Sequence, residues 1–584
     1  MKDRSGALRE LERDAARGSQ GERDGDPDVV VIGGGPAGAS AARLLSLWGN
    51  RVLLLTRPSS RPPFAESLPP SCRKLLDPLG VTALVEAEGF VRTAGNTVWW
   101  GDGNVRVHMF GDGSTGYQVT RDRFDRLLLE AARAAGVDCR DGAVVREVTG
   151  QGPGSFANEE IGTVGGGGDV AGAGKGVAHR APADTAHRKP GPLWRGGPVV
   201  RFDAGGRSGT VRCRWVIDAS GRSGVVARHG WRRPAAGHRT LALIAAWECP
   251  DGWHLDDETH TLVESYENGW AWSVPVSRTT RHFAVMVDPG RTRVVGRDRL
   301  GDVYAEEIAR TARFRSLLAQ AFPSAGPWAA DASSYDALHT TCHGIVLAGD
   351  AATFVDPLSS YGVKKALASG WLAAVVVDTC LAEPSLESVA LGFHEARERL
   401  MYESLTRQAA ELAREAGASH DHPFWLDRGT PGEPGEPGAP GTPGTLGALG
   451  EPGHGREPDI AALRADPEVL AAFEFIRRAP RLSLVPADTL RRVDRSVVHG
   501  HRVALHPHLA TPAFPEGIRF LRGIDLDLVV RLTSEFEQVP DLFEAYHRSA
   551  APVTMPDFLG VLAVLVGKGF LTDREPFPKV GPIP

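Results

Sequence analysis

The stretch that most constrains this chain is residues 28–56, DVVVIGGGPAGASAARLLSLWGNRVLLLT. The apolar run Val29–Ile32 predicts a buried parallel strand, because it lacks the alternation of a half-buried strand. Ala39–Trp48 predicts a helix that ends at Gly49, and Arg51–Leu55 predicts a second strand. The order strand, helix, strand is typical of a nucleotide-binding α/β unit.

Three glycines between the first strand and the helix, Gly33, Gly35 and Gly38, have the G-x-G-x-x-G spacing. In such a turn the first glycine permits a tight bend, the second lets the backbone approach a pyrophosphate, and the third lets helix and strand pack closely. The pyrophosphate then lies at the positive end of the helix. The motif predicts a dinucleotide site to which Pro36 and Ala37 contribute. A tight turn without a ligand is the alternative.

The end of the second strand differs from the usual dinucleotide pattern. An acidic residue commonly binds a ribose hydroxyl at this place, and here the residue is Thr56. A threonine hydroxyl can both donate and accept a hydrogen bond. Thr56 is therefore a candidate ribose ligand in place of the carboxylate.

Length and composition narrow the class of protein. A chain of 584 residues is too long for one core and predicts two or three domains. The net charge of -6 gives no reason to expect nucleic acid as a partner, and no apolar run is long enough to predict a membrane span. Six scattered cysteines without a C-x-x-C pair argue against a zinc site or a disulfide framework. With a charged N-terminus that lacks a secretory signal, they predict a cytoplasmic protein.

The ordered body is expected to span residues 27–429 and to contain two parts. One part is α/β and built from discontinuous segments. The other is an antiparallel sheet at about 235–335, where apolar and polar residues alternate. Residues 150–197 are rich in Gly and Ala, lack large apolar side chains, and predict a disordered insertion in a surface loop.

Three further segments flank this body. Residues 1–26 are charged throughout and predict a disordered tail. Residues 430–457 carry Gly at nearly every third position with many prolines, as collagen does. That run is short and loses its period, which favours a Pro/Gly linker. Residues 458–584 predict a helical or winged-helix-like C-terminal region.

A second informative segment lies at residues 344–370, far along the chain from the glycine turn. An apolar strand there meets Gly349 and Asp350. A turn then leads to Gly362 and Val363 at the start of a helix. In FAD-binding folds an aspartate so placed accepts hydrogen bonds from the ribityl chain, and the helix directs its positive end at the isoalloxazine. A Gly-Asp pair alone is common turn chemistry, but the two segments together predict bound FAD.

These segments, with VIDASGRSG at residues 216–224 between them, resemble the flavin-dependent monooxygenase superfamily. Within it, GWAWSVP at 269–275 is similar to the Trp-x-Trp-x-Ile-Pro signature of the tryptophan-halogenase-like group, and FAESLP and DPLSSYG are similar to other motifs of that group. The resemblance implies a Rossmann-like α/β FAD-binding domain with an inserted antiparallel β-sheet substrate domain, followed here by an α-helical C-terminal region. It also implies that Trp270 and Trp272 help to separate the flavin from the substrate chamber. A half-buried strand with aromatic side chains on one face is the alternative.

Several positions depart from the halogenase pattern. Halogenases of this kind have a lysine a few residues before the glutamate of the first loop, and residues 61–66 here contain an arginine and no lysine. They have a glutamate and a threonine where this chain has Ser359 and Tyr361. An arginine guanidinium is always protonated, so it cannot form the amine adduct that captures hypohalous acid. These departures argue against halogenation.

The lysine-less form resembles flavoproteins that oxidise tryptophan side chains during quinone-cofactor maturation. This resemblance implies an FAD-dependent monooxygenase that hydroxylates an indole or phenol, free or in a peptide or protein, through a flavin C4a-hydroperoxide formed with O2. NAD(P)H would supply the electrons through a separate flavin reductase. The rivals are a halogenase, a flavin-dependent double-bond reductase and a non-enzymatic binding protein.

The resemblance also assigns individual residues. The expected catalytic residues are Glu66, Trp270, Trp272, Pro357, Ser359 and Tyr361, with loop capping as the alternative role for Glu66. Arg121 matches a family arginine near FAD, and Val144 is expected to contact adenine through its backbone. Lys364 and Lys365 are expected to be phosphate-side or surface charges. Three histidines are expected to be structural or exposed rather than catalytic: His282, His339 and His343.

Overall fold

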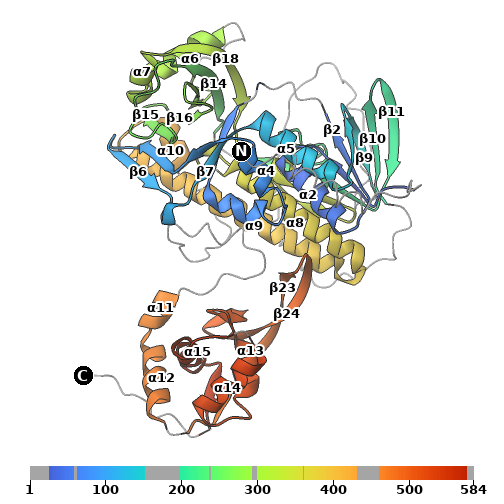
Figure 1. Ribbon diagram of the computed structural model, residues 1–584, viewed down its shortest axis with the longest axis vertical. Helices are drawn as coiled ribbons and strands as arrows, with labels where there is room; N and C mark the ends of the chain where they lie inside the picture. Colours follow the sequence, from blue (N-terminus) through green and yellow to red (C-terminus); the bar gives the residue numbers. More distant parts are fainter. Residues whose placement is uncertain are drawn as a thin grey trace, which may run out of the picture.

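The computed structural model describes residues 25–57, 62, 64–150, 197–235, 238–292, 299–359, 361–429, 460–479, 481–550 and 552–574. Nearly all of the predicted N-terminal tail, the predicted insertion and the predicted Pro/Gly linker lie outside the described residues. The described chain forms an α/β body, a large sheet beside it, and a C-terminal module below them in the view of Figure 1.

A six-stranded sheet forms the centre of the α/β body, in the order β20-β21-β12-β1-β2-β8. Its strands are β1 (Val29–Ile32), β2 (Val52–Thr56), β8 (Asp138–Asp141), β12 (Trp215–Asp218), β20 (Thr341–Cys342) and β21 (Ile345–Leu347). Strand β1 pairs in parallel with both neighbours, so that Val30 lies opposite Leu53 on one side and Val216 on the other. All of β1 is buried, as its unbroken apolar run predicts.

The two faces of this sheet are covered by different elements. Val29 and Val31 belong to one core, in which the helices α2 (Pro36–Leu47), α5 (Arg121–Ala134) and α8 (Gly362–Ala382) take part. Val30 and Ile32 belong to a second core. It lies under a three-stranded sheet of β9 (Val144–Thr149), β10 (Val199–Ala204) and β11 (Arg207–Arg212). The alternation of side chains along β1 thus separates the two cores.

Helix α8 is a core helix. By length and composition it could cross a membrane, but 72% of its apolar window is buried inside the protein. It packs against α2, where a side-chain carbon at Gly370 would lie 2.2 Å from the carbonyl oxygen of Ala37. It also contacts α9 (Glu387–Gly417). This close contact joins the start of α2 to the middle of α8.

The predicted antiparallel sheet is present and is larger than expected. Its order is β18-β14-β17-β16-β15-β5-β6. Its strands are β5 (Gly95–Trp99), β6 (Val105–Met109), β14 (Leu241–Glu248), β15 (Thr261–Tyr266), β16 (Gly269–Pro275), β17 (Thr280–Val287) and β18 (Phe322–Asp331). Strands β5 and β6 come from outside residues 235–335, and β5 pairs with β15 in parallel. Helices α6 (Leu300–Arg310) and α7 (Arg313–Leu318) share one of its apolar cores.

A small sheet contacts both larger units. It consists of β3 (Ala65–Leu68), β7 (Gly116–Thr120) and β4 (Val91–Thr93), and β3 contacts both β16 and α8. The other elements of the body are short: η1 (Pro70–Cys72), α3 (Arg73–Leu76), α4 (Thr82–Ala87), η2 (Gly111–Gly113), η3 (Gly221–Ser223), β13 (Arg232–Pro234), β19 (Tyr335–Ala337), η5 (Gly349–Ala351), η6 (Pro357–Ser359), η7 (Pro384–Leu386) and α10 (Pro423–Gly429).

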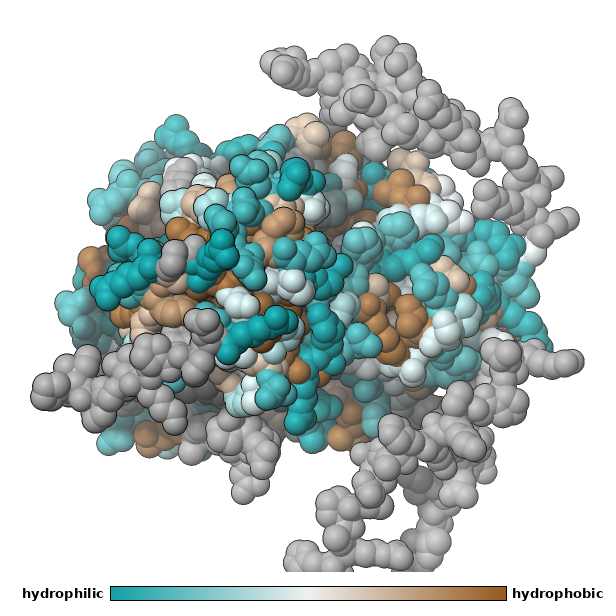
Figure 2. Space-filling view, turned by 90° about the horizontal axis from the view of Figure 1, so that it is seen from below, coloured by the Kyte–Doolittle hydropathy of each residue, from teal (hydrophilic) through white to brown (hydrophobic). Residues whose placement is uncertain are grey.

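The C-terminal module has its own apolar core and mixes helices with strands. Its helices are α11 (Ile460–Ala465), α12 (Pro467–Arg478), α13 (Leu526–Leu532), α14 (Val539–Ser549) and α15 (Met555–Gly567). Its strands are β22 (Leu484–Pro486), β23 (Arg491–His499), β24 (Arg502–Thr511), β25 (Phe514–Ile518), β26 (Phe520–Leu521), β27 (Ile524–Asp525) and β28 (Leu571–Asp573). The hairpin β23–β24 reaches the body, where the Val503 N–H donates to Thr379 Oγ1 at 2.8 Å. Seen from below, the surface is mainly hydrophilic with small apolar patches (Figure 2).

Candidate active site

One cavity of about 1210 Å³ extends from the α/β body to the seven-stranded sheet. Both segments that predict FAD line it, the first through Gly33 and Gly35 and the second through Asp350 and Gly362. Strands β1, β12 and β21 are parallel, so the turns that follow them lie at the same edge of the sheet. Segments far apart in the sequence therefore form a single site.

The glycine turn is tightly packed at two positions and open at the third. Gly33 has a φ of +104°, and a side-chain carbon there would lie 2.4 Å from the carbonyl oxygen of Ala219. A side-chain carbon at Gly38 would lie 1.9 Å from the carbonyl oxygen of Gly33. At Gly35 a side-chain carbon would meet no described atom within 4 Å, and this residue lines the cavity. The turn therefore leaves room for an anion at the N-terminus of α2, and the residues present fit an FAD pyrophosphate.

Other predicted nucleotide contacts line the same part of the cavity. Pro36 and Ala37 are the first residues of α2, Thr56 ends β2, and Val144 begins β9. The Thr56 hydroxyl is 3.5 Å from the carbonyl oxygen of Arg57, which is long for a hydrogen bond between oxygens. That hydroxyl can therefore turn toward a ligand.

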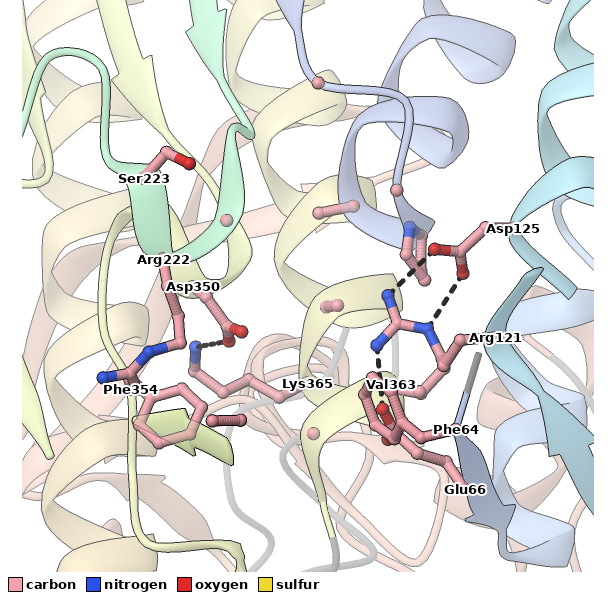
Figure 3. A pocket seen from close by; sticks show the side chains of 18 of the residues that line it. Phe64, Glu66, Arg121, Asp125, Arg222, Ser223, Asp350, Phe354, Val363 and Lys365 are labelled. Atoms are coloured by element: carbon pink, nitrogen blue, oxygen red, sulfur yellow. Dashed lines mark hydrogen bonds and ion pairs between the residues drawn. The ribbon is translucent and has the colours of Figure 1, made fainter. Parts of the chain in front are cut away.

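Arg121, at the start of α5, joins two carboxylates at the cavity wall (Figure 3). Its Nη1 donates to Glu66 Oε1 at 2.8 Å, and its Nε and Nη2 donate to the two carboxylate oxygens of Asp125 at 3.0 Å. Desolvation raises the pKa of Glu66, although the Arg121 cation counteracts this effect. Glu66 is thus a carboxyl group that gains a proton more readily than an exposed one.

Asp350 follows β21 and lies beside Lys365 in the cavity (Figure 3). The Lys365 Nζ is 3.7 Å from Asp350 Oδ1, and it donates to the carbonyl oxygens of Gly349, at 3.1 Å, and Thr353. Lys364 is also buried, and desolvation lowers its pKa. The expectation that these lysines are surface charges is therefore wrong. Backbone carbonyls and Asp350 replace the water that an exposed Lys365 ammonium would bind.

Aromatic and aliphatic side chains of the seven-stranded sheet line the other half of the cavity. Trp270 and Trp272 stand two residues apart on β16 and so face the same side. Trp270 is buried, Trp272 is half-buried, and both line the cavity. The same chamber is lined by Ile244, Val263, Val274, Met286 and Trp328. Its walls fit a flat apolar ring.

The DPLSSYG turn borders this chamber at the start of α8. Pro357 and Tyr361 line the cavity, as do Gly362 and Val363 of the helix. The Tyr361 ring is 5.0 Å from the Lys364 Nζ. The side chain of Ser359 lies outside the part of the chain that the structure describes, so its predicted role stays a prediction.

The three histidines that the sequence sets aside are not among the residues that line the cavity. His282 Nδ1 accepts the backbone N–H of Ala65 at 2.9 Å, and desolvation lowers the pKa of His282 to about 4. His339 is exposed with its ring 6.2 Å from that of Trp231. His343 forms an ion pair with Glu387, and this hydrogen bond raises the pKa of His343.

Comparison with known proteins supports the flavin assignment. The FAD binding domain family matches residues 26–159. The chain is similar to flavin-dependent halogenase armH1 of Armillaria mellea, with 27% identity over 398 residues, which cover 63% of this chain and 68% of that protein.

Two solved structures extend the likeness through the C-terminal module. CmlS, a flavin-dependent halogenase, matches with a TM-score of 0.65 and 20% identity. The match covers 94% of this chain and 96% of the CmlS chain. The chain is an FAD-dependent oxidoreductase with the halogenase-like fold. The peptidyl tryptophan dihydroxylase QhpG, essential for tryptophylquinone cofactor biogenesis, has a TM-score of 0.57 and 20% identity, and covers 93% of this chain and 99% of its own. The rival interpretation, a non-enzymatic binding protein, is set aside because of the FAD binding domain match and the halogenase relatives.

Two residues that support the turn before Asp350 in this oxidoreductase are missed by sequence reasoning. Ser369 Oγ accepts the Gly349 N–H at 2.7 Å and donates to Glu398 Oε1 at 2.5 Å. Ser369 lies four residues after Lys365, so a helical spacing could have placed both on one face of α8. Glu398 is on α9 and carries no local signal in the sequence.

Proposed function

We propose that this oxidoreductase is a monooxygenase that hydroxylates an indole or phenol ring, either free or as a side chain of a peptide. When bound, reduced FAD and O2 supply the chemistry: one oxygen atom enters the ring and the other leaves as water. The observation that carries the proposal is the aromatic chamber, which belongs to the same cavity as the glycine turn and Asp350, while the Lys365 Nζ donates to backbone carbonyl oxygens beside Asp350. An apolar, water-poor chamber favours an uncharged ring as substrate.

The glycine turn and the Asp350 segment hold the cofactor in this proposal. Gly35 and the N-terminus of α2 take the pyrophosphate, and Asp350 accepts hydrogen bonds from the ribityl chain. Thr56 binds a ribose hydroxyl, and the backbone of Val144 contacts the adenine. Arg121 fixes β3 at the cavity wall through its ion pair with Glu66.

The chamber residues position the ring and exclude water. Trp270 and Trp272 form the wall between cofactor and substrate, and Pro357 and Tyr361 close the side next to α8. Glu66 accepts the proton that the ring loses when aromaticity is restored. Its Oε2 is the available atom, because Oε1 accepts from Arg121, and a side-chain carbon at Gly362 would lie 3.4 Å from Oε2. The raised pKa of Glu66 suits a group that takes up a proton.

Halogenation is the second candidate, and the name of armH1 favours it. A lysine that captures hypohalous acid must present a neutral amine to the chamber. Lys365 lines the cavity, but its ammonium donates to two carbonyl oxygens and lies 3.7 Å from the Asp350 carboxylate. With these contacts on the side of Asp350, the Lys365 Nζ is not presented to the chamber as a free amine. This arrangement supports hydroxylation over halogenation.

The decisive experiment measures product mass. The protein, FAD, a flavin reductase with NAD(P)H and isotopically labelled O2 are mixed with a tryptophan peptide, free tryptophan or a phenol, with and without bromide. Hydroxylation predicts the gain of labelled oxygen in at least one substrate, unchanged by bromide. A matched peptide with leucine in place of tryptophan is the control. A brominated product would establish the halogenase, and labelled oxygen in none of the substrates would refute the proposal.

A further inference from the structure

A buried polar network lies behind the turn that the cofactor is expected to contact. Lys365 is 4% exposed, and its Nζ donates to the carbonyl oxygens of Gly349 and Thr353. These two bonds span 16 and 12 residues, so they join the start of α8 to the turn after β21. The same Nζ is 3.7 Å from Asp350 Oδ1 (Figure 3).

The other side of the turn is held by a second pair of side chains. The Gly349 N–H donates to Ser369 Oγ, and the Ser369 hydroxyl donates to Glu398 Oε1. Glu398 is 0% exposed, and its Oε2 has no hydrogen-bond partner among the described residues. Gly349 is therefore held at both its N–H and its carbonyl oxygen, by Ser369 and Lys365. A backbone unit fixed at both ends keeps the following Asp350 in one orientation.

The charge of Lys365 also matters, because the residue lines the cavity. Electrostatic interactions are stronger where water is excluded than at the surface. Two-electron reduction of a flavin can leave negative charge on its ring, and a fixed cation favours that charged form. The Asp350 carboxylate beside Lys365 repels that added charge and so offsets part of the effect, and removal of the Lys365 cation would leave this repulsion unopposed.

We propose that Lys365 is a fixed cation of the flavin site, which positions Asp350 and makes the protein bind reduced FAD more tightly than it would without this charge. Ser369 holds the same turn but carries no charge. Its contribution to the binding free energy is therefore equal for oxidised and reduced FAD. The two residues can be separated by measuring both affinities.

The test compares the dissociation constants of oxidised and reduced FAD, measured without substrate and, for the reduced form, without oxygen. In K365M the ratio of the dissociation constant of reduced FAD to that of oxidised FAD is expected to rise about tenfold. This change corresponds to about 1.4 kcal/mol. The midpoint potential of the bound flavin falls accordingly. In S369A both constants rise by the same factor.

Further variants guard against loss of folding. K365Q keeps hydrogen-bond donors for the two carbonyls without the charge, and it is expected to change the ratio as K365M does. Lys568 in the C-terminal module pairs with Asp466 at 2.6 Å and Glu468 at 2.8 Å, so K568M lowers stability but leaves both constants unchanged. If the ratio of the two FAD dissociation constants is unchanged in K365M and K365Q, the proposal is overturned. The result is independent of whether the enzyme hydroxylates or halogenates, because no substrate is present.

Discussion

The Arg121 guanidinium and the Glu66 carboxylate form an ion pair at the cavity wall, with 2.8 Å between Nη1 and Oε1. Asp125 accepts from the other edge of the same guanidinium. The backbone N–H of Arg121 also donates to the carbonyl oxygen of Phe64 at 3.0 Å. Arg121 thus ties the start of α5 to the strand that carries Glu66.

Replacing Arg121 with methionine should lower the free energy of unfolding by about 2 kcal/mol at pH 7. The loss is smaller than for a fully buried pair, because the two side chains are 26% and 21% exposed. Desolvation already raises the pKa of Glu66, and loss of the cation raises it further. A charged Glu66 then costs stability above its unfolded pKa of about 4.5, and the cost shrinks as falling pH protonates it. Urea unfolding at several pH values measures this loss of stability and its dependence on pH.

The control for that prediction is the double variant R121M/E66Q. The amide at position 66 stays neutral at every pH. The free energy of unfolding of the double variant should therefore not rise between pH 7 and pH 5 as that of R121M does. If R121M loses the same free energy at both pH values, Glu66 is not the group left without its partner.

Trp272 is expected to couple the consumption of oxygen to the modification of the substrate. W272A enlarges the chamber and admits water, so oxygen should still be consumed while the yield of modified substrate falls about tenfold, equivalent to about 1.4 kcal/mol. Oxygen uptake and product mass, measured together, give the coupling ratio. W253A is the matched control, because Trp253 packs on Phe283 in a core that the chamber wall does not share. Equal coupling in W272A and the parent protein would contradict the role of Trp272.

The parts of the site that the sequence predicts are those with local signals. The glycine turn is contained in one strand-helix unit, and Gly33, Gly35 and Gly38 have positions that their spacing alone implies. Trp270 and Trp272 share a face because a strand alternates every two residues. In each case the chemistry and the geometry lie within about ten residues of one another.

The parts that the sequence does not predict depend on contacts between distant segments. Lys365 looks like a surface charge on a helix until the carbonyls of Gly349 and Thr353 are placed beside it. Glu398 reaches Ser369, behind the turn that carries Asp350, because α9 packs on α8. The parallel pairing of β5 with β15 joins strands from two distant segments, and neither strand alone encodes it.

His282 should make the protein sensitive to acid. Desolvation lowers its pKa from 6.5 to about 4, while the negative charge of Asp122 acts in the opposite direction. Above pH 6.5 the imidazole is neutral in both states. Between pH 6.5 and 4 the unfolded chain binds a proton that the folded chain does not, so stability falls by about 3 kcal/mol and then levels off.

The variant H282N keeps an acceptor for the Ala65 N–H and does not titrate. Its free energy of unfolding should fall less steeply between pH 6.5 and 4 than that of the parent protein. Some slope remains, because burial also lowers the pKa of His238 to about 4 and of His394 to about 3. H339N, at an exposed position, is the control. Identical slopes for H282N and the parent would rule out His282 as a source of acid sensitivity.

The hairpin β23–β24 is expected to anchor the C-terminal module through a single buried carboxylate. Asp378 is 3% exposed, and its Oδ2 is 2.8 Å from Arg502 Nε while its Oδ1 accepts from Asn50 at 2.8 Å. R502A removes the charged partner and should lower the free energy of unfolding by about 2 kcal/mol. Amide hydrogen exchange at residues 498–503 should speed up, while the FAD dissociation constant stays unchanged.

A control on the same hairpin separates this anchor from an ordinary surface ion pair. Arg495 pairs with Glu516, whose side chain is 85% exposed, so R495A should cost at most about 0.5 kcal/mol and leave exchange at residues 498–503 unaltered. The contrast follows from burial: loss of Arg502 leaves the buried Asp378 carboxylate with Asn50 and the more distant His501 ring, whereas loss of Arg495 leaves the Glu516 carboxylate in water. Equal effects of R502A and R495A on exchange would mean that the apolar contacts of Val498 and Val503 with the body, and not the Asp378 pair, hold the module in place.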